Sequence, residues 1–276
     1  MLIIPSHLGT AKPINDLPKP GAIVGILPIV AECRATAQGL ARRLGAKLID
    51  SSPTEGLYLA CGIEGLSLRL RTVRRRELAI RAELGGGRQA YRAGHASPRG
   101  EAIARACGLP RYGSRYVVDA TAGLGRDAHI LARLGARVTL LERSPVILAL
   151  LEDGFDRASR QTQSLDWLAR MRLIGGDATV WLRSCATVQR PEVVFLDPMY
   201  PRQTKGAAPG KEMQILQALL GTADDAGSLL QAARAAASDR VVVKRPRQAE
   251  PLAGESPHYR IIGRSTRFDV YLHSCE

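Results

Sequence analysis

Short apolar runs alternate with stretches of helical periodicity from residue 113 to the C-terminus. Such runs predict buried strands, and apolar residues recurring every three or four positions predict helices packed on one face. The expected strands span residues 116–119, 136–142, 171–175, 192–196 and 240–243, with a final hairpin of 259–262 and 268–272. Regular alternation of strand and helix is typical of a parallel sheet covered by helices. This part of the chain is therefore predicted to be an α/β domain.

Residues with known terminal preferences mark the helix boundaries in this region. The helix expected at 125–134 ends at Gly135, and glycine commonly ends helices because it adopts a left-handed backbone conformation. Ser144 and Pro145 offer an N-cap and a first-turn proline to the next helix. Further helices are expected at 213–220 and 229–237.

The N-terminal part of the chain has a different pattern. Strands are expected at 21–27, 47–49, 57–60 and 66–70, with a helix at 31–44. We interpret residues 1–84 as a small α+β module and residues 85–276 as the larger domain. The segment 83–99 has little apolar periodicity and is expected to be a connector or a substrate-facing loop, followed by a helix at 99–108.

Composition indicates a soluble protein with a strong positive charge. The net charge of +13 and the isoelectric point near 10.1 favour binding to phosphate backbones, although solubility alone is an alternative reason for such charge. The five cysteines are scattered and none forms a Cys-x-x-Cys pair, so neither disulfides nor a zinc site is expected. The histidines lack metal-binding spacing. No apolar stretch is long enough to span a membrane, so we predict a cytoplasmic protein without membrane or metal.

A glycine-containing turn follows the first expected strand, in the sequence Asp119-Ala-Thr-Ala-Gly-Leu-Gly-Arg-Asp127. Gly123 and Gly125 let the backbone approach a ligand, and the next helix directs its free N–H groups toward it. Thr121 stands where a dinucleotide-binding motif has its first glycine, so the turn alone is weak evidence for a nucleotide.

Acidic residues at the ends of the next two strands could recognise a nucleoside. Glu142 ends the second strand, where a carboxylate can accept hydrogen bonds from ribose hydroxyls, or can simply be solvated. Asp177 follows the third strand and could accept from an adenine amino group or cap the next helix. No Lys-Ser or Lys-Thr pair follows the glycines, so an ATP-binding P-loop is excluded. These features fit S-adenosylmethionine better than NAD, with Asp119 near its ammonium group.

A second motif, Asp197-Pro198-Met199-Tyr200, closes the fourth strand. The exocyclic amine of a base is a poor nucleophile, and a carboxylate with a backbone carbonyl can accept its two N–H bonds and turn the nitrogen toward a methyl donor. An aromatic ring can stack on the base. Asp197, the Pro198 carbonyl and Tyr200 supply these groups, although a strand-ending Asp-Pro turn is a common structural feature. Both motifs end parallel strands, so they are expected to face one cleft.

Basic residues near these motifs are candidates for binding nucleic acid. The predicted substrate-binding residues are Tyr200, Lys205, Lys211, Lys244, Arg245 and Arg247. Lys205 and Lys211 flank a glycine-rich loop, and the last three follow the fifth strand. Another basic set, Arg69 to Arg76 in the N-terminal module, either positions RNA or is a solvated face.

Taken in order, the motifs resemble those of a known family, the bacterial 16S ribosomal RNA (guanine-N2)-methyltransferases of the RsmJ type. The similar segments are the glycine turn, 141–143, 196–201, 211–213, 241–246 and 267–271. Met199 replaces the second proline of the usual amino-methyltransferase tetrapeptide. The similarity covers roughly residues 85 to 272 and is weaker in the N-terminal module.

The resemblance implies a class I methyltransferase fold, a Rossmann-like sheet of seven strands that ends in an antiparallel hairpin. It implies methyl transfer from S-adenosylmethionine to N2 of a guanine near the 3′ end of 16S RNA, with that RNA or the small ribosomal subunit as partner. The expected catalytic residues are Asp197, Pro198 and Tyr200. With the turn residues, the expected cofactor-binding set is Asp119, Thr121, Gly123, Gly125, Arg126, Asp127, Glu142, Arg143, Asp177, Ala178 and Asp197.

Two other functions are compatible with the same features. An amino-methyltransferase acting on adenine in DNA or on a protein glutamine shares the Asp/Asn-Pro-x-aromatic arrangement. A non-catalytic RNA-binding factor in ribosome assembly could keep the fold without the reaction. Methyl transfer to purified RNA, DNA or protein distinguishes the possible methyltransferase substrates. Absence of S-adenosylmethionine binding would favour the non-catalytic RNA-binding factor.

Overall fold

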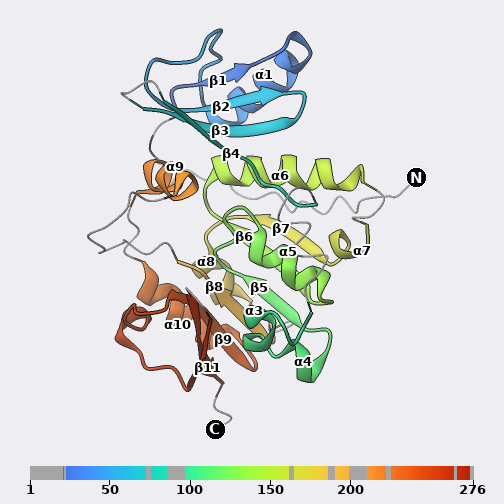
Figure 1. Cartoon of the computed structure of the whole chain (residues 1–276), viewed down its shortest axis with the longest axis vertical. Helices are drawn as coiled ribbons and strands as arrows, with labels where there is room; N and C mark the ends of the chain where they lie inside the picture. Colours follow the sequence, from blue (N-terminus) through green and yellow to red (C-terminus); the bar gives the residue numbers. More distant parts are fainter. Residues whose placement is uncertain are drawn as a thin grey trace.

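The structure is a computed structural model of the whole chain. It describes residues 21, 23–72, 76–85, 97–161, 165–185, 190–198, 210–221, 225–263 and 266–273. Two sheets stand one above the other along the long axis of the molecule, a four-stranded N-terminal sheet and a seven-stranded sheet (Figure 1). Among the described residues, no helix is both long and apolar enough to cross a membrane.

The seven-stranded sheet has the strand order β10-β11-β9-β8-β5-β6-β7. Its strands are β5 (Tyr116–Asp119), β6 (Arg137–Glu142), β7 (Met171–Gly175), β8 (Val193–Leu196), β9 (Arg240–Pro246), β10 (Tyr259–Ile262) and β11 (Thr266–Leu272). The first five are parallel, and β10 and β11 form the antiparallel end. The predicted class I methyltransferase sheet, including its terminal hairpin, is confirmed.

Helices cover both faces of this sheet. One face carries α3 (Ala102–Ala106), α5 (Arg126–Arg133) and α6 (Pro145–Ser159), and the other carries α8 (Ala178–Ser184) and α10 (Ala226–Ala236). Short helices α4 (Leu109–Tyr112) and α7 (Leu165–Leu168) complete the first layer. Ser144 caps α6 as predicted, its Oγ accepting a hydrogen bond from the Ile147 backbone N–H, with Pro145 in the first turn.

The N-terminal sheet has the order β1-β2-β3-β4, comprising β1 (Ile26–Pro28), β2 (Gly56–Gly62), β3 (Gly65–Arg71) and β4 (Glu77–Ile80). The 3-10 turn η1 (Ala31–Cys33) leads into α1 (Arg34–Leu44), which ends at Gly45 as predicted. The expected strand at 47–49 is reduced to a single bridge between Leu48 and Ile26. The first strand is shorter than the predicted 21–27, and β4 was not predicted.

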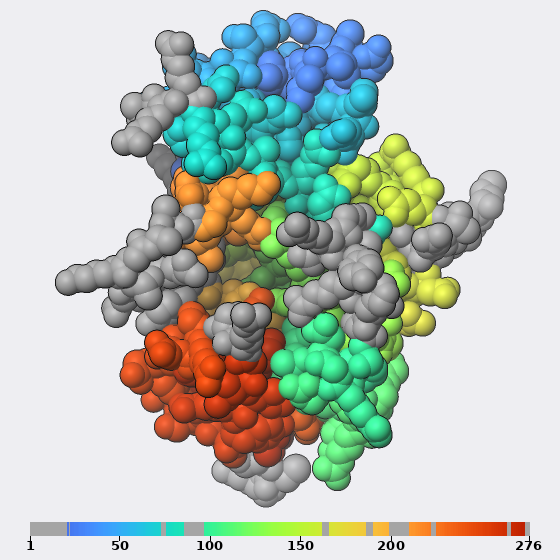
Figure 2. All heavy atoms as spheres, in the orientation of Figure 1, coloured from blue at the N-terminus to red at the C-terminus, as the bar shows by residue number. Residues whose placement is uncertain are grey.

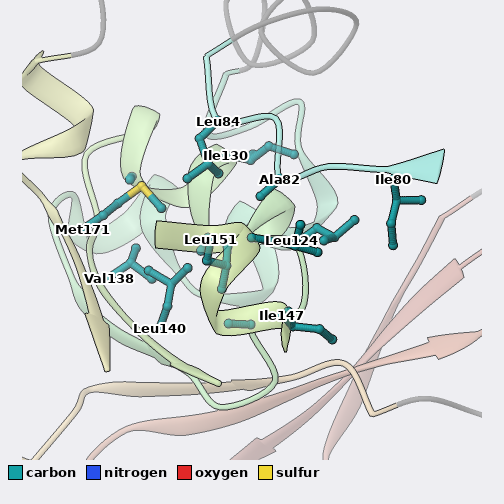
Figure 3. Packing of buried hydrophobic residues seen from close by; sticks show 14 of the residues in the cluster. Ile80, Ala82, Leu84, Leu124, Ile130, Val138, Leu140, Ile147, Leu151 and Met171 are labelled. Atoms are coloured by element: carbon teal, nitrogen blue, oxygen red, sulfur yellow. The ribbon is translucent and has the colours of Figure 1, made fainter. Parts of the chain in front are cut away.

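The two sheets share one continuous apolar core. Buried residues of the small sheet belong to the same cluster as those of α5 and α6. Beyond β4, Ala82 and Leu84 lie beside Ile130 and Leu151 of the larger domain (Figure 3). The predicted boundary at residue 84 thus separates two sheets but does not separate two cores.

Helix α9 (Lys211–Leu220) belongs to the second half of the chain but packs against β2, β3 and β4 of the small sheet. Its side chains Ile215 and Leu219 are fully buried in the shared core. The Leu219 carbonyl also accepts a 2.9 Å hydrogen bond from the Gly21 backbone N–H. In Figure 1, α9 lies directly below the small sheet. The surface is hollowed between α9 and the C-terminal part of the molecule (Figure 2).

Candidate active site

The glycine turn after β5 forms one wall of the candidate site. Asp119 is 1% exposed, and its Oδ1 accepts a 3.1 Å hydrogen bond from the Thr121 backbone N–H. Gly123 and Gly125 have φ angles of 53° and 74°, which residues other than glycine rarely adopt. A Cβ on Gly125 would lie 3.0 Å from the Leu151 side chain and 3.1 Å from that of Leu84. Gly125 therefore allows both the left-handed turn and close packing at the start of α5.

Thr121 joins this turn to the second motif. Its Oγ1 accepts a 2.6 Å hydrogen bond from the backbone N–H of Asp197, which follows β8. The neighbouring strands β5 and β8 are parallel, with Asp119 paired with Phe195. The expectation that the two motifs meet at one edge of the sheet agrees with this geometry. It also gives a reason for threonine where a dinucleotide motif has glycine, because glycine could not accept this bond.

Lys244 of β9 links the two motifs electrostatically. Its Nζ lies 2.6 Å from Oδ2 of Asp127, in the first turn of α5, and 2.9 Å from Oδ2 of Asp197. The two carboxylates raise the pKa of the Lys244 ammonium against the opposing effect of its burial, so the side chain stays charged. We predicted Lys244 as a substrate contact from its position after the strand. The structure pairs it with the candidate cofactor and catalytic carboxylates.

Glu142 ends β6 beside the glycine turn and is 7% exposed. Its Oε2 accepts a 3.1 Å hydrogen bond from the Gly123 N–H, and its Oε1 accepts a 2.7 Å bond from the Ser144 N–H. Each carboxylate oxygen can accept a further bond. Burial raises the pKa of Glu142 to about 7, although these backbone donors lower it. The carboxylate is thus fixed in orientation at the position expected for a ribose contact.

Burial also raises the pKa values of the other two central carboxyl groups. The pKa of Asp119 is raised to about 8, with the charges of Asp127 and Asp197 adding to the effect of burial. For Asp197, burial and the Asp127 charge raise the pKa above its ordinary value, against the lowering effect of Lys244. A nearby positive charge favours the ionised form of such buried acids. A cationic ligand is therefore expected to bind next to them.

The residues present fit S-adenosylmethionine. Asp119, Asp127 and Asp197 are three acidic groups with the single ammonium of Lys244 beside them, so a ligand bearing a sulfonium and an ammonium group would favour the ionised forms of the groups that burial keeps protonated. The backbone is open at both glycine positions that face the site: a Cβ on Gly123 would approach only the Thr121 carbonyl at 3.8 Å, and one on Gly176 would meet no described atom within 4 Å. Glu142 provides the acceptor for a ribose diol.

Asp177 and Ala178 begin α8 directly after β7. One carboxylate oxygen of Asp177 accepts a 3.0 Å hydrogen bond from the Val180 N–H, so the side chain caps the helix. The capping alternative considered from the sequence is therefore present, and the second oxygen is the one left for an adenine contact. Ala178 is 8% exposed. The Gly176 N–H donates a 2.9 Å bond to the Glu142 carbonyl, which keeps this turn next to the ribose position.

The two arginines predicted on the cofactor side form ion pairs with other helices. Arg126 lies 2.5 Å from Glu212 in the first turn of α9, and Arg143 is bonded to Asp225 at the start of α10. These contacts tie the glycine turn to α9 and the end of β6 to α10. Both arginines thus fix the helices near the glycine turn, and their contact with the cofactor stays a prediction.

The predicted RNA-binding residues differ in their exposure to solvent. Arg247 and Lys211 are exposed. Arg245 is only 4% exposed, and its guanidinium donates bonds of 3.1 and 2.7 Å to the Glu250 carbonyl, so burial argues against its predicted RNA contact. Successive strand residues point to opposite faces, so Lys244 and Arg245 cannot both face the cleft. Tyr200 and Lys205 lie outside the described residues, and Pro198 is the last described residue of its motif.

In the N-terminal sheet, part of the predicted basic set is neutralised within the protein. Arg69 and Arg71 both pair with Glu77, at 2.9 and 3.8 Å. Arg74 and Arg75 lie outside the described residues. In the part of the chain that the structure describes, no group of three or more His, Cys, Asp or Glu side chains could hold a metal ion.

Comparison with known proteins identifies close relatives over most of the chain. A family model of SAM-dependent methyltransferases matches residues 40–273. The chain is 46% identical to ribosomal RNA small subunit methyltransferase J of Thioalkalivibrio sulfidiphilus, covering 87% of this chain and 94% of that protein. It is 48% identical to the protein of the same name from Alkalilimnicola ehrlichii, covering 86% and 90%. A crystal structure of a SAM-dependent methyltransferase from Neisseria gonorrhoeae matches with a TM-score of 0.71 and 36% identity, covering 90% of this chain and 96% of that one.

Proposed function

The chain belongs to the ribosomal RNA small subunit methyltransferase J family of SAM-dependent methyltransferases, and we propose that it methylates the N2 amino group of a guanine in 16S ribosomal RNA. The observation that carries the chemical part of this proposal is the junction of Asp197 with the glycine turn. The 2.6 Å bond from its backbone N–H to Thr121 Oγ1 keeps the amine-binding motif within one side-chain length of the cofactor turn. Action on ribosomal RNA makes the cytoplasm the proposed location.

S-adenosylmethionine, when bound, supplies an electrophilic methyl group on a sulfonium centre. In our proposal, Glu142 accepts hydrogen bonds from its ribose, Asp119 lies by its ammonium group, and Asp177 uses its second carboxylate oxygen for the adenine amino group. The N–H groups at the start of α5, beyond Gly125, face the same ligand. The neighbouring carboxylates stabilise positive charge.

The Asp197 carboxylate and the Pro198 carbonyl accept the two N–H bonds of the guanine amine in this proposal. This contact directs the nitrogen lone pair away from the ring system and toward the methyl group. Tyr200 stacks on the unpaired base. After methyl transfer, the nitrogen must release a proton, and an Asp197 oxygen is the nearest proposed acceptor. Lys244 acts as a positioning residue, because its bond to Asp197 Oδ2 leaves Oδ1 as the freer acceptor.

The central test is the variant Asp197→Ala, with Asp156→Ala as the matched control. Asp156 is also a paired carboxylate, 2.5 Å from Arg160, but lies on the exposed side of α6. We expect Asp197→Ala to lower kcat on 16S RNA by about 100-fold or more, since it removes a group that orients the nucleophile. Cofactor binding measured by calorimetry should weaken far less than kcat falls, because Asp119, Glu142 and Asp177 keep their positions, and the control should match the wild type.

Tritium transfer from labelled S-adenosylmethionine to purified 16S RNA, small subunits, DNA and protein extends this test to the substrate. We expect label in ribosomal RNA, and mass mapping should find it on guanine N2. Near-normal transfer by Asp197→Ala contradicts the mechanism. Label confined to DNA or protein contradicts the substrate, and absence of cofactor binding by the wild type contradicts catalysis altogether.

A further inference from the structure

A cavity lined by basic and aromatic residues lies at the amino ends of the parallel strands of the seven-stranded sheet. The candidate active site lies at their carboxyl ends. Its volume is about 320 Å³, and its lining residues are Arg99, Arg105, Gly108, Pro110, Arg111, Tyr112, Arg240 and Tyr259. A second hollow of the same volume adjoins it and shares Arg99 and Pro110. Among the described residues that line the two hollows, none is acidic. Together they form a longer depression, which suits part of a polymer better than a compact metabolite.

Two tyrosines give this cavity stacking surfaces. Tyr112 and Tyr259 are 48% and 38% exposed, which is high for large aromatic side chains. The Tyr112 ring is held by guanidinium groups of Arg115, Arg111 and Arg240, at 4.6, 5.2 and 5.9 Å from its centroid. The Tyr259 hydroxyl accepts a 3.0 Å hydrogen bond from Arg240. Both side chains are therefore held by arginines and remain partly exposed.

The arginines divide into a structural pair and an exposed set. Arg115 and Arg240 are buried and both bind Asp239, and Arg115 also pairs with Glu192, so their charges are balanced. Arg105 donates bonds of 2.7 and 3.2 Å to the carbonyls of Arg99 and Gly100, which carry no net charge. Arg99, Arg105 and Arg111 thus make the lining of the cavity positively charged. Exposed cationic groups beside fixed aromatic rings are the combination that binds single-stranded nucleic acid, with phosphates on the cations and bases on the rings.

One lining residue of the cavity, Arg240, lies on the face of the sheet that also carries the lysine of the candidate active site. Arg240 and Lys244 are the first and fifth residues of β9, so their side chains point to the same face. Between them, Val242 is buried in the core that includes α3. Four residues of strand place the two positions roughly 13 Å apart. The segments that bear the cavity, α3 and α4 on one side and β9 on the other, meet in the lower part of Figure 1.

We propose that this cavity binds a nucleotide flanking the methylation target, with its phosphate on Arg99 and Arg111 and its base stacked on Tyr112. The inference rests on the proposed function, since it assumes an RNA substrate whose target base occupies the candidate active site. The cavity adds a second, separate point of contact at the amino ends of the parallel strands, whereas the target base is proposed to bind at their carboxyl ends. Two points of contact fix both the position of the RNA strand and the direction in which it runs across the protein.

The test compares Arg99→Gln combined with Arg111→Gln, and Tyr112→Ala, with two controls. Arg172→Gln removes an exposed arginine from β7, at the opposite edge of the sheet. Tyr112→Phe keeps the stacking ring and reports on folding. We expect the double variant to weaken binding of 16S RNA about tenfold and to reduce the slope of log affinity against log salt by about 1 to 2. Tyr112→Ala should weaken binding about tenfold with little change in that slope, because stacking is not ionic.

Steady-state kinetics separates this inference from the proposed function. Both cavity variants should raise KM for RNA and leave kcat at saturating RNA and the Kd for S-adenosylmethionine unchanged. If the wild type fails to methylate 16S RNA, the proposed function fails, while the RNA affinities still decide the role of the cavity. Wild-type affinity and salt slope in both variants would overturn the inference. So would normal binding to free RNA with loss of binding only to assembled subunits, since the partner of the cavity would then be a ribosomal protein.

Discussion

Single side chains determine how the two motifs are joined. Thr121 connects the glycine turn to Asp197 by a hydrogen bond, and Lys244 connects Asp127 to Asp197 by charge. Neither contact follows from spacing along the chain, because the partners are brought together only when β5, β8 and β9 align. The presence of an acidic group after β5, β6 and β8 could be predicted from sequence, but the lysine between them could not.

The burial of Arg245 could have been predicted, because alternation along a strand assigns adjacent residues to opposite faces. With Lys244 facing the carboxylates, Arg245 must face the other side, where it donates to the Glu250 carbonyl. The role of Asp177, by contrast, could not be predicted. An aspartate at this position suits both helix capping and cofactor binding, so the sequence alone gives no basis for choosing between the two roles.

The raised pKa of Glu142 leads to a prediction about pH. A buried acid with a folded-state pKa of about 7, against an ordinary value of 4.5, holds its proton where the unfolded chain has released it. The unfolded state therefore binds fewer protons, and the free energy of unfolding must fall as pH rises from about 4 to 7. Glu142 contributes roughly 3 kcal/mol to this fall. Urea unfolding of the cofactor-free protein across this range should reveal the slope.

Glu142→Gln should reduce that slope, because glutamine does not titrate, while Asp119, whose pKa is also raised, continues to contribute to it. The same variant should weaken binding of S-adenosylmethionine and remove the gain in affinity that we expect for the wild type as pH rises through about 7. Asp177→Asn, which keeps a helix-capping oxygen, is a useful comparison for cofactor affinity. An unchanged pH slope in Glu142→Gln would show that another group is responsible.

At the scale of elements, α6 is the helix on which both parts of the molecule depend. It packs on β6 and β7 of the large sheet and on β3 of the small one. Gly154 allows the close approach: a Cβ there would lie 2.8 Å from the Ala82 carbonyl oxygen and 3.0 Å from the Ala82 Cβ. A backbone neighbour cannot move aside as a flexible side chain can.

Gly154→Ala should therefore destabilise the protein although alanine favours helices. Overpacking of this kind costs about 1 to 3 kcal/mol, more than the gain of about 1 kcal/mol in helix propensity. The matched control is Gly39→Ala in α1, where the new Cβ would meet no described atom within 4 Å, and where propensity alone predicts stabilisation. Chemical denaturation of the two variants should give opposite signs. Equal stabilisation would mean that the contact with Ala82 is not rigid.

The elements that sequence analysis predicted best are those whose boundaries are set locally. The strands at β5 and β7 and the cap of α6 have the predicted residues, because an apolar run or a Ser-Pro pair defines each of them. Strand β4 has four residues like β5, but only Leu78 and Ile80 are buried, so it has no continuous apolar run and was not predicted. Helix α8 is seven residues long, too short for periodicity to be evident.

At the scale of the whole molecule, the small sheet and the methyltransferase domain fold around one core. The predicted boundary at residue 84 stays a prediction, since separate sheets do not establish separate folding units. Ile215 and Leu219 of α9 are fully buried in the cluster that includes β4. Exposing each such side chain costs about 1.5 to 3 kcal/mol.

A fragment of residues 85–276 should therefore be much less stable than the full chain. We expect a lower Tm, binding of a hydrophobic dye and aggregation near room temperature, all measured beside the full chain. Cofactor should raise its Tm only weakly, because Arg126 would lose the stable position of its α9 partner Glu212. A fragment that melts at the same temperature as the full chain without dye binding would establish an independent domain.

The attachment of α9 to the small sheet also bears on how such proteins can diverge or be recombined. Pro198 follows β8 of the large sheet, and Gly210 is the N-cap of α9, which packs on the small one. An exchange of N-terminal modules between relatives would thus change the surface on which α9 packs, and α9 follows the substrate motif in the chain. This change would occur even if every catalytic residue were retained. Functional chimeras should require the inner face of α9 to be inherited together with β2, β3 and β4.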